Sequence, residues 1–244
     1  MGFMIQRGGF VARPPQVTPK AESPPARHNV RSRWLIVAVW LLGVVIAFTC
    51  SLRLARTRAV DSDGASQALQ AWDMLHGNVL LHGWWLSDVS FYTTELPEYV
   101  LVELVRGLNQ DVVHVAAATT YTLVLLLAAL LAKGSATGRV AVARVAITVG
   151  VMMGPQLASG VKIFLSSPDH IGTSVPVLAA FIVLDHARVP PRRYVPVLVS
   201  ALLGWAVVAD TLVLFIGVLP IALVCLLRVG RGVGAERRWR SIMA

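Results

Sequence analysis

The chain has 244 residues, of which 56% are hydrophobic and 14% are charged, and its mean hydropathy is +0.67. This composition excludes an ordinary soluble domain and indicates an integral membrane protein. The formal net charge of +9 would suit nucleic acid only if the basic residues shared one solvated face. They lie instead at the edges of apolar runs, so we expect contact with membrane lipid and no binding of nucleic acid.

Residues 1–33 are basic, contain five prolines and have few large apolar side chains after Phe10. Such a segment cannot bury enough surface to fold, so we predict a disordered tail. A second basic tail is expected over residues 229–244. Cys50 and Cys225 both lie inside apolar runs, which argues against a disulfide framework.

Six apolar runs between the tails predict an all-α polytopic membrane protein with about six transmembrane helices over residues 34–228. The first three runs are close to the length of about 20 residues that a ~30 Å hydrocarbon layer requires, and the last three are shorter. Glycines and Pro155 in the third run predict an interruption toward its outer end. In chain order the runs are Trp34–Leu52, Val112–Ala132, Val145–Leu165, Ile171–Leu184, Tyr194–Ala209 and Thr211–Leu227.

The distribution of charge predicts the topology. Of the 22 basic residues, 17 lie in residues 1–33, in the loops 133–144 and 188–193, and in the end of the chain from Arg228 onward, so these segments are expected to be cytoplasmic. The other face then holds the loop 53–111, and eight of the 13 acidic residues lie between Asp61 and Asp111. We therefore expect a multi-pass protein of the plasma membrane, with both termini cytoplasmic and this acidic loop outside.

The outer loop is predicted to contain two surface helices. Apolar residues recur at three- and four-residue spacing from Ala65 onward, which is typical of an amphipathic helix, and Gly77 ends it. A second helix is expected to begin near Pro97 and to end at Gly107, because proline and an acidic residue suit a first helical turn. The apolar face of the first helix is predicted to hold Ala65, Ala68, Leu69, Trp72, Leu75 and Val79.

Asp61 and Asp63 at the start of the first surface helix are the candidate catalytic residues. A carboxylate at the membrane boundary can accept a proton from a hydroxyl group, as a general base does. The alternative for Asp63 is a helix cap, in which its oxygens accept hydrogen bonds from the first free N–H groups. On this spacing alone the cap is favoured, because most helix starts are capped, although one residue can serve both roles.

Downstream, the stretch SDVSFYTTELPEY places Asp88, Glu95 and Tyr99 among aromatic residues. Aromatics beside carboxylates suit a sugar with its hydroxyls, and they equally suit an aromatic belt at the membrane interface. Lys162 and His170 lie near the outer end of the third span and are candidates for binding a phosphate. The competing interpretations are a lysine that extends to water and a solvated histidine. No metal-ligand spacing is present, and Asp210 is interpreted as marking a turn.

The order of these motifs resembles the GT-C glycosyltransferase superfamily, in particular the aminoarabinose and protein mannosyl transferases. The stretch DGASQALQAWDMLHGN, which begins at Asp63, is similar to the family's acidic residue and surface helix after the first span. Glu95, Pro97 and Tyr99 resemble its second conserved segment, although Leu96 stands where relatives often have a basic residue.

The resemblance covers residues 34–228 and implies a polyprenyl-phosphate sugar as donor, with no cofactor beyond this lipid and no metal assigned. It implies inverting transfer, with Asp63 deprotonating the acceptor hydroxyl. The leaving phosphate would meet basic outer residues, namely Lys162, His170, Arg53, Arg56, Arg58 or Arg106. Family enzymes are usually about twice as long. The interpretations of this shorter, amino-terminal module are a minimal member, a truncated member, and half of a split enzyme whose partner membrane chain supplies the missing half. The alternatives are a catalytically silent scaffold and a small transporter.

Overall fold

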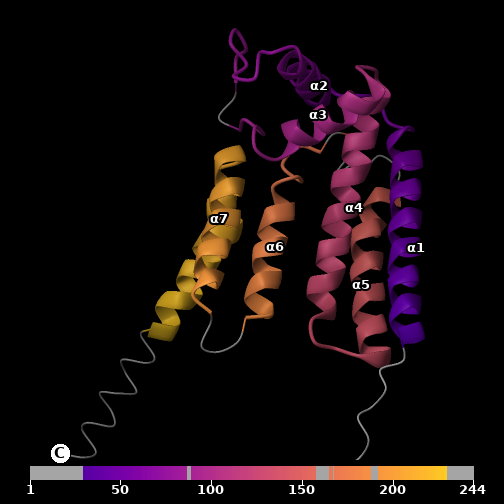
Figure 1. Cartoon of the computed structure of the whole chain (residues 1–244), viewed down its shortest axis with the longest axis vertical. Helices are drawn as coiled ribbons and strands as arrows, with labels where there is room; N and C mark the ends of the chain where they lie inside the picture. Colours follow the sequence, from indigo (N-terminus) through magenta and orange to yellow (C-terminus); the bar gives the residue numbers. More distant parts are fainter. Residues whose placement is uncertain (1–29, 87–88, 158–164, 167, 188–191, 230–244) are drawn as a thin grey trace, which may run out of the picture. The chain divides into compact units, whose positions relative to one another are not determined.

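The computed structural model describes residues 30–86, 89–157, 165–166, 168–187 and 192–229 (Figure 1). These residues are largely helical and include no strand, so the all-α prediction is confirmed for the described part of the chain. The described residues from Trp40 onward belong to one compact unit. The helices are α1 (Val30–Ala55), α2 (Ser62–Leu75), α3 (Glu95–Arg106), α4 (Asp111–Lys133), α5 (Gly138–Leu157), α6 (Ser174–Asp185), α7 (Tyr194–Ala209) and a final helix over Leu214–Val229 that opens with the π-helical turn η1 (Leu214–Val218).

Two of the described helices are long and apolar enough to cross a membrane. They are Trp34–Ala55 and Asp111–Lys133, with mean hydropathies of 2.6 and 2.1. The last three predicted runs form apolar helices as well, but these are shorter than a usual span, so the six-span topology stays a prediction. Helix α5 continues through Gly150 to Leu157, and the interruption predicted beyond it falls outside the described residues.

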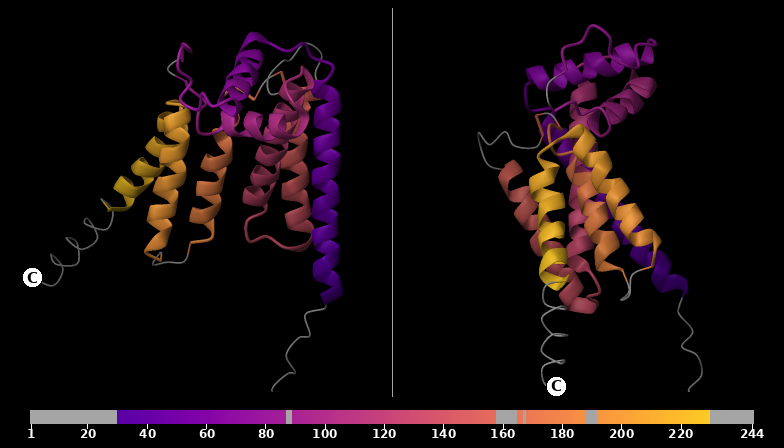
Figure 2. Two further views of the ribbon diagram at one scale, coloured as in Figure 1. Left: turned by 45° about the horizontal axis from the view of Figure 1, so that its top comes forward. Right: turned by 90° about the vertical axis from the view of Figure 1, so that its left-hand side faces the viewer.

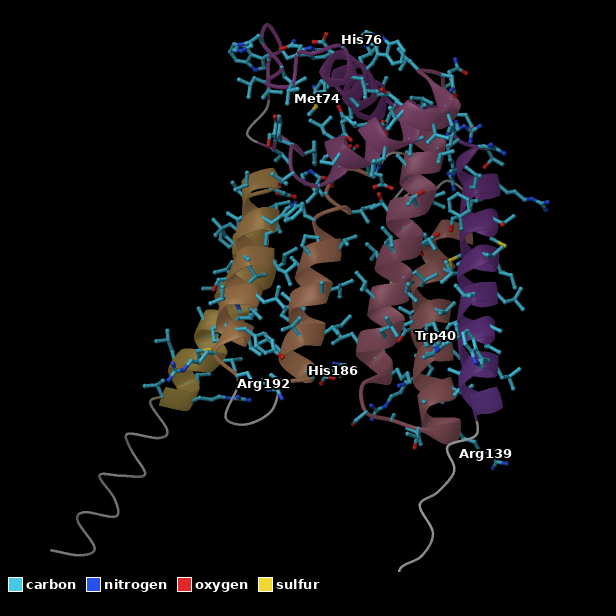
Figure 3. All side chains as sticks on the ribbon, viewed as in Figure 1. Trp40, Met74, His76, Arg139, His186 and Arg192 are labelled. Carbon is cyan, nitrogen blue, oxygen red and sulfur yellow. The ribbon has the colours of Figure 1, made fainter. Side chains whose placement is uncertain are left out.

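Large apolar side chains are exposed along several helices (Figure 3). A soluble protein rarely exposes apolar patches of such extent, whereas hydrocarbon does not penalise them. The exposed faces therefore agree with a location in the membrane. Their members include Leu41, Val45 and Ile46 on α1, Val142, Ile147 and Val151 on α5, Val197, Trp205 and Val208 on α7, and Leu219, Leu223 and Leu226 on the final helix.

The apolar core of the helical bundle is made of small and β-branched side chains. Helices α6, α7 and the final helix pack through one cluster, in which Gly217 of the π-helical turn lies against Leu203 and Val177. Helix α4 contacts both α5 and α6 and so links the two halves of the bundle. The members of the first cluster are Val177, Ala180, Val195, Val199, Leu203, Ala206 and Val213.

Helices α2 and α3 form a layer across the ends of α4 and α6 (Figures 1 and 2). The layer is held by a second apolar cluster to which Ala68 and Ala71 of α2, Tyr99 of α3, and Val112 of α4 contribute. The two predicted surface helices of the outer loop are therefore present. Helix α3 begins at Glu95, two residues before the predicted start, and ends at Gly107 as predicted.

The structure of α2 bears on two sequence-based predictions, the capping residue and the apolar face. Asp61, and not Asp63, caps the helix: its Oδ1 accepts a hydrogen bond of 2.9 Å from the N–H of Gly64. Asp63 lies in the first turn and is exposed. Leu69, on the predicted apolar face, is 49% exposed, whereas Ala68 and Ala71 of the same face are buried against α3 and α4.

We predict that Asp61→Ala weakens the first turn of α2 by about 1 kcal/mol, the typical value of a helix cap. Amide hydrogen exchange of residues 62–66 should then become roughly fivefold faster, since local opening becomes easier. Asp61→Asn should keep the wild-type rate because asparagine caps equally well. Asp63→Ala is the matched neighbour, and faster exchange there than in Asp61→Ala would contradict the assignment of the cap.

Candidate functional site

A buried polar cluster lies beneath α2, between α3, α4 and the loop that precedes α6. It consists of Gln67 of α2, Glu95, Glu98 and Tyr99 of α3, and Asp169 of the loop, and it is called the acid cluster below. Gln67 and Asp169 are joined directly, with Nε2 donating to Oδ1 at 2.7 Å. Electrostatic interactions connect Asp169 with both Glu95 and Tyr99, so the five side chains form one group.

Glu95 is fully buried at the first residue of α3, and a glycine of the loop makes room for it. A Cβ atom at Gly172 would lie 2.6 Å from the carboxyl carbon of Glu95, closer than real Cβ atoms come to their neighbours. Only glycine therefore fits this position while Glu95 keeps its place. The hydroxyl of Thr94 donates a hydrogen bond to Oε2 of Glu95.

Glu98 lies on the next turn of α3 and faces α4, where Thr120 donates a hydrogen bond to its Oε2. Thr120 is nine residues into α4, which corresponds to roughly 14 Å along the helix axis at about 1.5 Å per residue. The carboxyl group of Glu98 thus meets a helix that is long and apolar enough to cross the membrane. The acid cluster therefore adjoins the apolar part of the structure.

Several polar atoms of the acid cluster are buried without a hydrogen bond among the described residues. They are Oε1 of Gln67, Oε1 of Glu95, Oε1 of Glu98 and the hydroxyl of Tyr99. A buried polar atom without a partner costs about 1–3 kcal/mol, and most such atoms in proteins are satisfied by protein or water. Three acceptors and one hydroxyl in one place are suited to a ligand or water that donates several hydrogen bonds.

Burial also changes the acidity of these groups. It raises the pKa of Glu95 to about 7, against smaller opposing effects of hydrogen bonds from Thr94 and the backbone. Burial likewise raises the pKa of Glu98 to about 7, with a further contribution from the charge of Glu95. The pKa of the Tyr99 hydroxyl is raised for the same reasons. Near neutral pH the two glutamates therefore exchange between a form that accepts and a form that can donate a proton.

His170, in the same loop as Asp169, lies beside a second buried carboxylate. Its Nδ1 is 2.6 Å from Oδ2 of Asp210, whose side chain is 1% exposed at the end of α7. The ring of Phe91 packs against the histidine, edge to face, with centroids 5.4 Å apart. Asp210 marks a turn, as the sequence suggested, and it also binds His170, which the sequence did not indicate.

The outer basic residues proposed to meet a phosphate are partly occupied. Arg56, just after α1, donates from Nε and Nη2 to the two carboxylate oxygens of Asp111, at 2.7 and 2.6 Å. Arg106 of α3 binds Asp111 as well, at 2.8 Å. This network ties α1 and α3 to the start of α4, so Arg53 and Arg58 remain the outer arginines without a described ion pair.

The predicted site residues are only partly brought together. Glu95 and Tyr99 belong to the acid cluster, His170 lies beside it, and Asp61 caps α2 and interacts electrostatically with Tyr99. Asp63 is exposed, with Ser62 Oγ at 3.5 Å from its carboxylate.

Asp88 and Lys162 fall outside the described residues, and no cluster of three metal-binding side chains occurs in the described ranges. The sequence pattern did not identify three members or neighbours of the acid cluster, namely Gln67, Asp169 and Gly172. Each belongs to the site only through a contact with a segment more than 70 residues away in the chain.

A cavity of about 410 Å³ lies between α6 and α7 at the end away from α2 and α3, where Figure 3 labels His186 and Arg192. Its walls are about as polar as they are apolar, and none of the predicted site residues lines it within the described part of the chain. The lining residues are Val183, His186, Ala187, Arg192, Tyr194, Val195 and Leu198. This cavity is therefore separate from the acid cluster.

The sequence matches no protein-family model, and neither a curated protein nor a solved structure is significantly similar to the chain. The resemblance to the GT-C superfamily accordingly rests on the motif residues alone. The geometry adds a polar site at the end of apolar helices, beneath two helices that lie across them.

We expect Gly172→Ala to displace Glu95 and to destabilise the protein by about 1–3 kcal/mol, the usual cost of overpacking. Thermal unfolding in detergent measures this as a lower Tm. The double variant Gly172→Ala with Glu95→Asp, which shortens the opposing side chain, should regain part of the loss. Gly150→Ala in α5, where a Cβ meets nothing within 4 Å, is the control that should not lower Tm.

The raised pKa values of Glu95 and Glu98 predict a pH-dependent stability. Each carboxyl binds its proton more tightly when folded, so its stabilising effect is complete below the unfolded value of about 4.5 and is lost as pH rises through about 7. Chemical unfolding in detergent between pH 4.5 and 8 should show the decline, and Glu95→Gln should make it shallower, leaving the contribution of Glu98. A wild-type stability that rises over this range would refute the burial of the neutral acids.

Proposed function

We propose that this protein is a membrane glycosyltransferase, which moves a sugar from a polyprenyl-phosphate donor to an acceptor at the outer face of the plasma membrane. The observation that carries the proposal is the set of unpaired polar atoms in the acid cluster. Sugar hydroxyls are hydrogen-bond donors, and carboxylate and amide oxygens are the acceptors that they need. The resemblance of the outer-loop motifs to the GT-C superfamily supports the same class of donor.

The position of the acid cluster suits a lipid-linked substrate. Helices α2 and α3 cover it from one side, and apolar helices extend from it on the other. A polyprenyl chain would lie along the exposed apolar helices, which places its phosphate and sugar at their ends. Eight acidic residues lie between Asp61 and Asp111, so this face carries the polar and charged groups on which sugar recognition depends.

The transfer is proposed to be an inverting displacement. The acceptor oxygen forms a bond to the anomeric carbon, the bond from that carbon to the phosphate oxygen breaks, and polyprenyl phosphate leaves with the electron pair. The acceptor proton passes to a base, for which the resemblance implies Asp63. In the fold, the acid cluster would hold the sugar hydroxyls, and Arg53 or Arg58 at the end of α1 would meet the phosphate.

The proposal is tested by single-turnover transfer from a labelled polyprenyl-phosphate sugar pool in membranes that contain the protein. We expect transfer by the wild type and a tenfold or greater rise in the donor concentration for half-maximal rate in Gln67→Leu, which removes acceptor and donor atoms at similar size. Asp185→Asn, an exposed residue at the end of α6, is the control and should behave as wild type. A wild type that is folded but transfers no sugar from widely sampled donors would refute the proposal and favour a catalytically silent scaffold.

A further inference from the structure

Three segments far apart in the sequence meet beside the acid cluster, at Phe91, His170 and Asp210. Phe91 and His170 touch through their rings, and each has a positive φ, of 52° and 58°. Residues other than glycine rarely adopt this conformation, and it persists only where the surroundings enforce it. The N–H of Phe91 also donates to the carbonyl of Ala209, next to Asp210. Strain at two touching residues is typical of a functional site.

Asp210 holds the imidazole of His170 in one orientation. Its Oδ1 accepts the N–H of Leu212 at 2.8 Å, and its Oδ2 lies 2.6 Å from Nδ1 of the histidine. A carboxylate only accepts, so Nδ1 carries the proton and the lone pair of the neutral ring lies on Nε2. The His170 side chain is 48% exposed, and within the described residues its Nε2 has no hydrogen bond. The imidazole is thus held in place through Nδ1, and its Nε2 is left to accept a proton.

The charges around His170 are acidic on each neighbouring element. They include Asp210 at the end of α7, Asp169 of its own loop, and Glu95 of α3, which lies against Gly172 of the same loop. Arg56 and Arg106 form their described ion pairs with Asp111 and not with these acids. Such surroundings oppose a bound anion but stabilise a positive charge that forms on the ring. They favour proton uptake by His170 over binding of a phosphate.

We propose that His170, oriented by Asp210, is the base that accepts the acceptor's proton in the proposed transfer. The inference rests on the proposed function and replaces Asp63 in the role implied by the resemblance. As the acceptor oxygen attacks the anomeric carbon, its O–H bond breaks and an N–H bond forms at Nε2, while the electron pair of the cleaved bond leaves with the phosphate. Asp210 then stabilises the imidazolium, so it is a positioning residue.

The placement of His170 relative to the acid cluster supports this role. Its chain neighbour Asp169 binds Gln67, and Gly172, two residues further, touches Glu95. A hydroxyl compound bound near the acid cluster therefore lies close to the loop that carries the histidine. Asp63, by contrast, contacts only Ser62 within the described structure, and no described residue from another element orients its carboxylate.

The orientation of the histidine is tested without any assay of activity. NMR titration of the histidine rings in the full-length protein in lipid nanodiscs, assigned with His170→Gln, should show the Nδ1–H tautomer for His170. Asp210→Asn should move the midpoint of its titration at least one pH unit lower, because the imidazolium loses its carboxylate. Asp185→Asn, beside the exposed His186, is the matched control and should leave the His170 midpoint unchanged. An Nε2–H tautomer, or no change in Asp210→Asn, would overturn the pair.

The proton transfer is tested by the pH dependence of single-turnover sugar transfer. The wild-type rate should decrease at pH values below the midpoint of the His170 titration, and this decrease is the acid limb of the pH profile. Asp210→Asn should shift the acid limb to lower pH. His170→Gln should reduce the rate about 100-fold or more and abolish the acid limb. Asp63→Asn should keep the limb at its wild-type pH, whatever its rate. Loss of the limb in Asp63→Asn and not in His170→Gln would overturn the inference. Absence of transfer in the wild type refutes the proposed function and this role of the histidine, while the NMR titration still decides the Asp210 contact.

Discussion

The approach of Gly172 to the carboxyl group of Glu95 is the contact on which the outer part of the structure depends. It fixes the loop before α6 against the first turn of α3, and the same loop then carries Asp169 to Gln67 and His170 to Asp210. A larger residue at position 172 would displace the carboxyl group of Glu95 from this place. The acid cluster and the contact between His170 and Asp210 therefore both depend on the packing of Gly172 against Glu95.

The two groups differ in their relation to solvent, and the difference corresponds to different chemistry. The acid cluster is buried, so desolvation raises the pKa of Glu95 and Glu98 and leaves several polar atoms without partners. The imidazole of His170 is half exposed but is held by a buried carboxylate. A buried cluster that accepts hydrogen bonds is suited to selecting a ligand, and a fixed, accessible ring is suited to moving a proton.

Local patterns predicted the elements better than the site. Apolar spacing and the glycines at 77 and 107 located α2 and α3, because capping and amphipathic periodicity depend on neighbours in the sequence. The sequence pattern indicated Asp63 as the possible cap, because both acids precede the same apolar face, but the cap is Asp61. Glu95 and Tyr99 were found from their composition. Gln67, Gly172 and the partner of His170 could not be predicted, because each acquires its role through a contact between distant segments.

The hydrogen bonds of the outer layer also constrain how the protein is assembled. Gln67 meets Asp169 across 102 residues, Trp205 and Thr93 bind each other across 112, and Ser90 reaches Val208 across 118. During synthesis the segment that contains α2 and α3 leaves the ribosome long before these partners exist. Glu95 and Glu98 therefore remain hydrated and charged through the early stages of insertion. They become buried when α4 and the loop before α6 arrive, because Thr120 contacts Glu98 and Gly172 contacts Glu95. Uptake of protons by these glutamates therefore precedes the last step, in which Trp205 and Val208 of α7 bind Thr93 and Ser90.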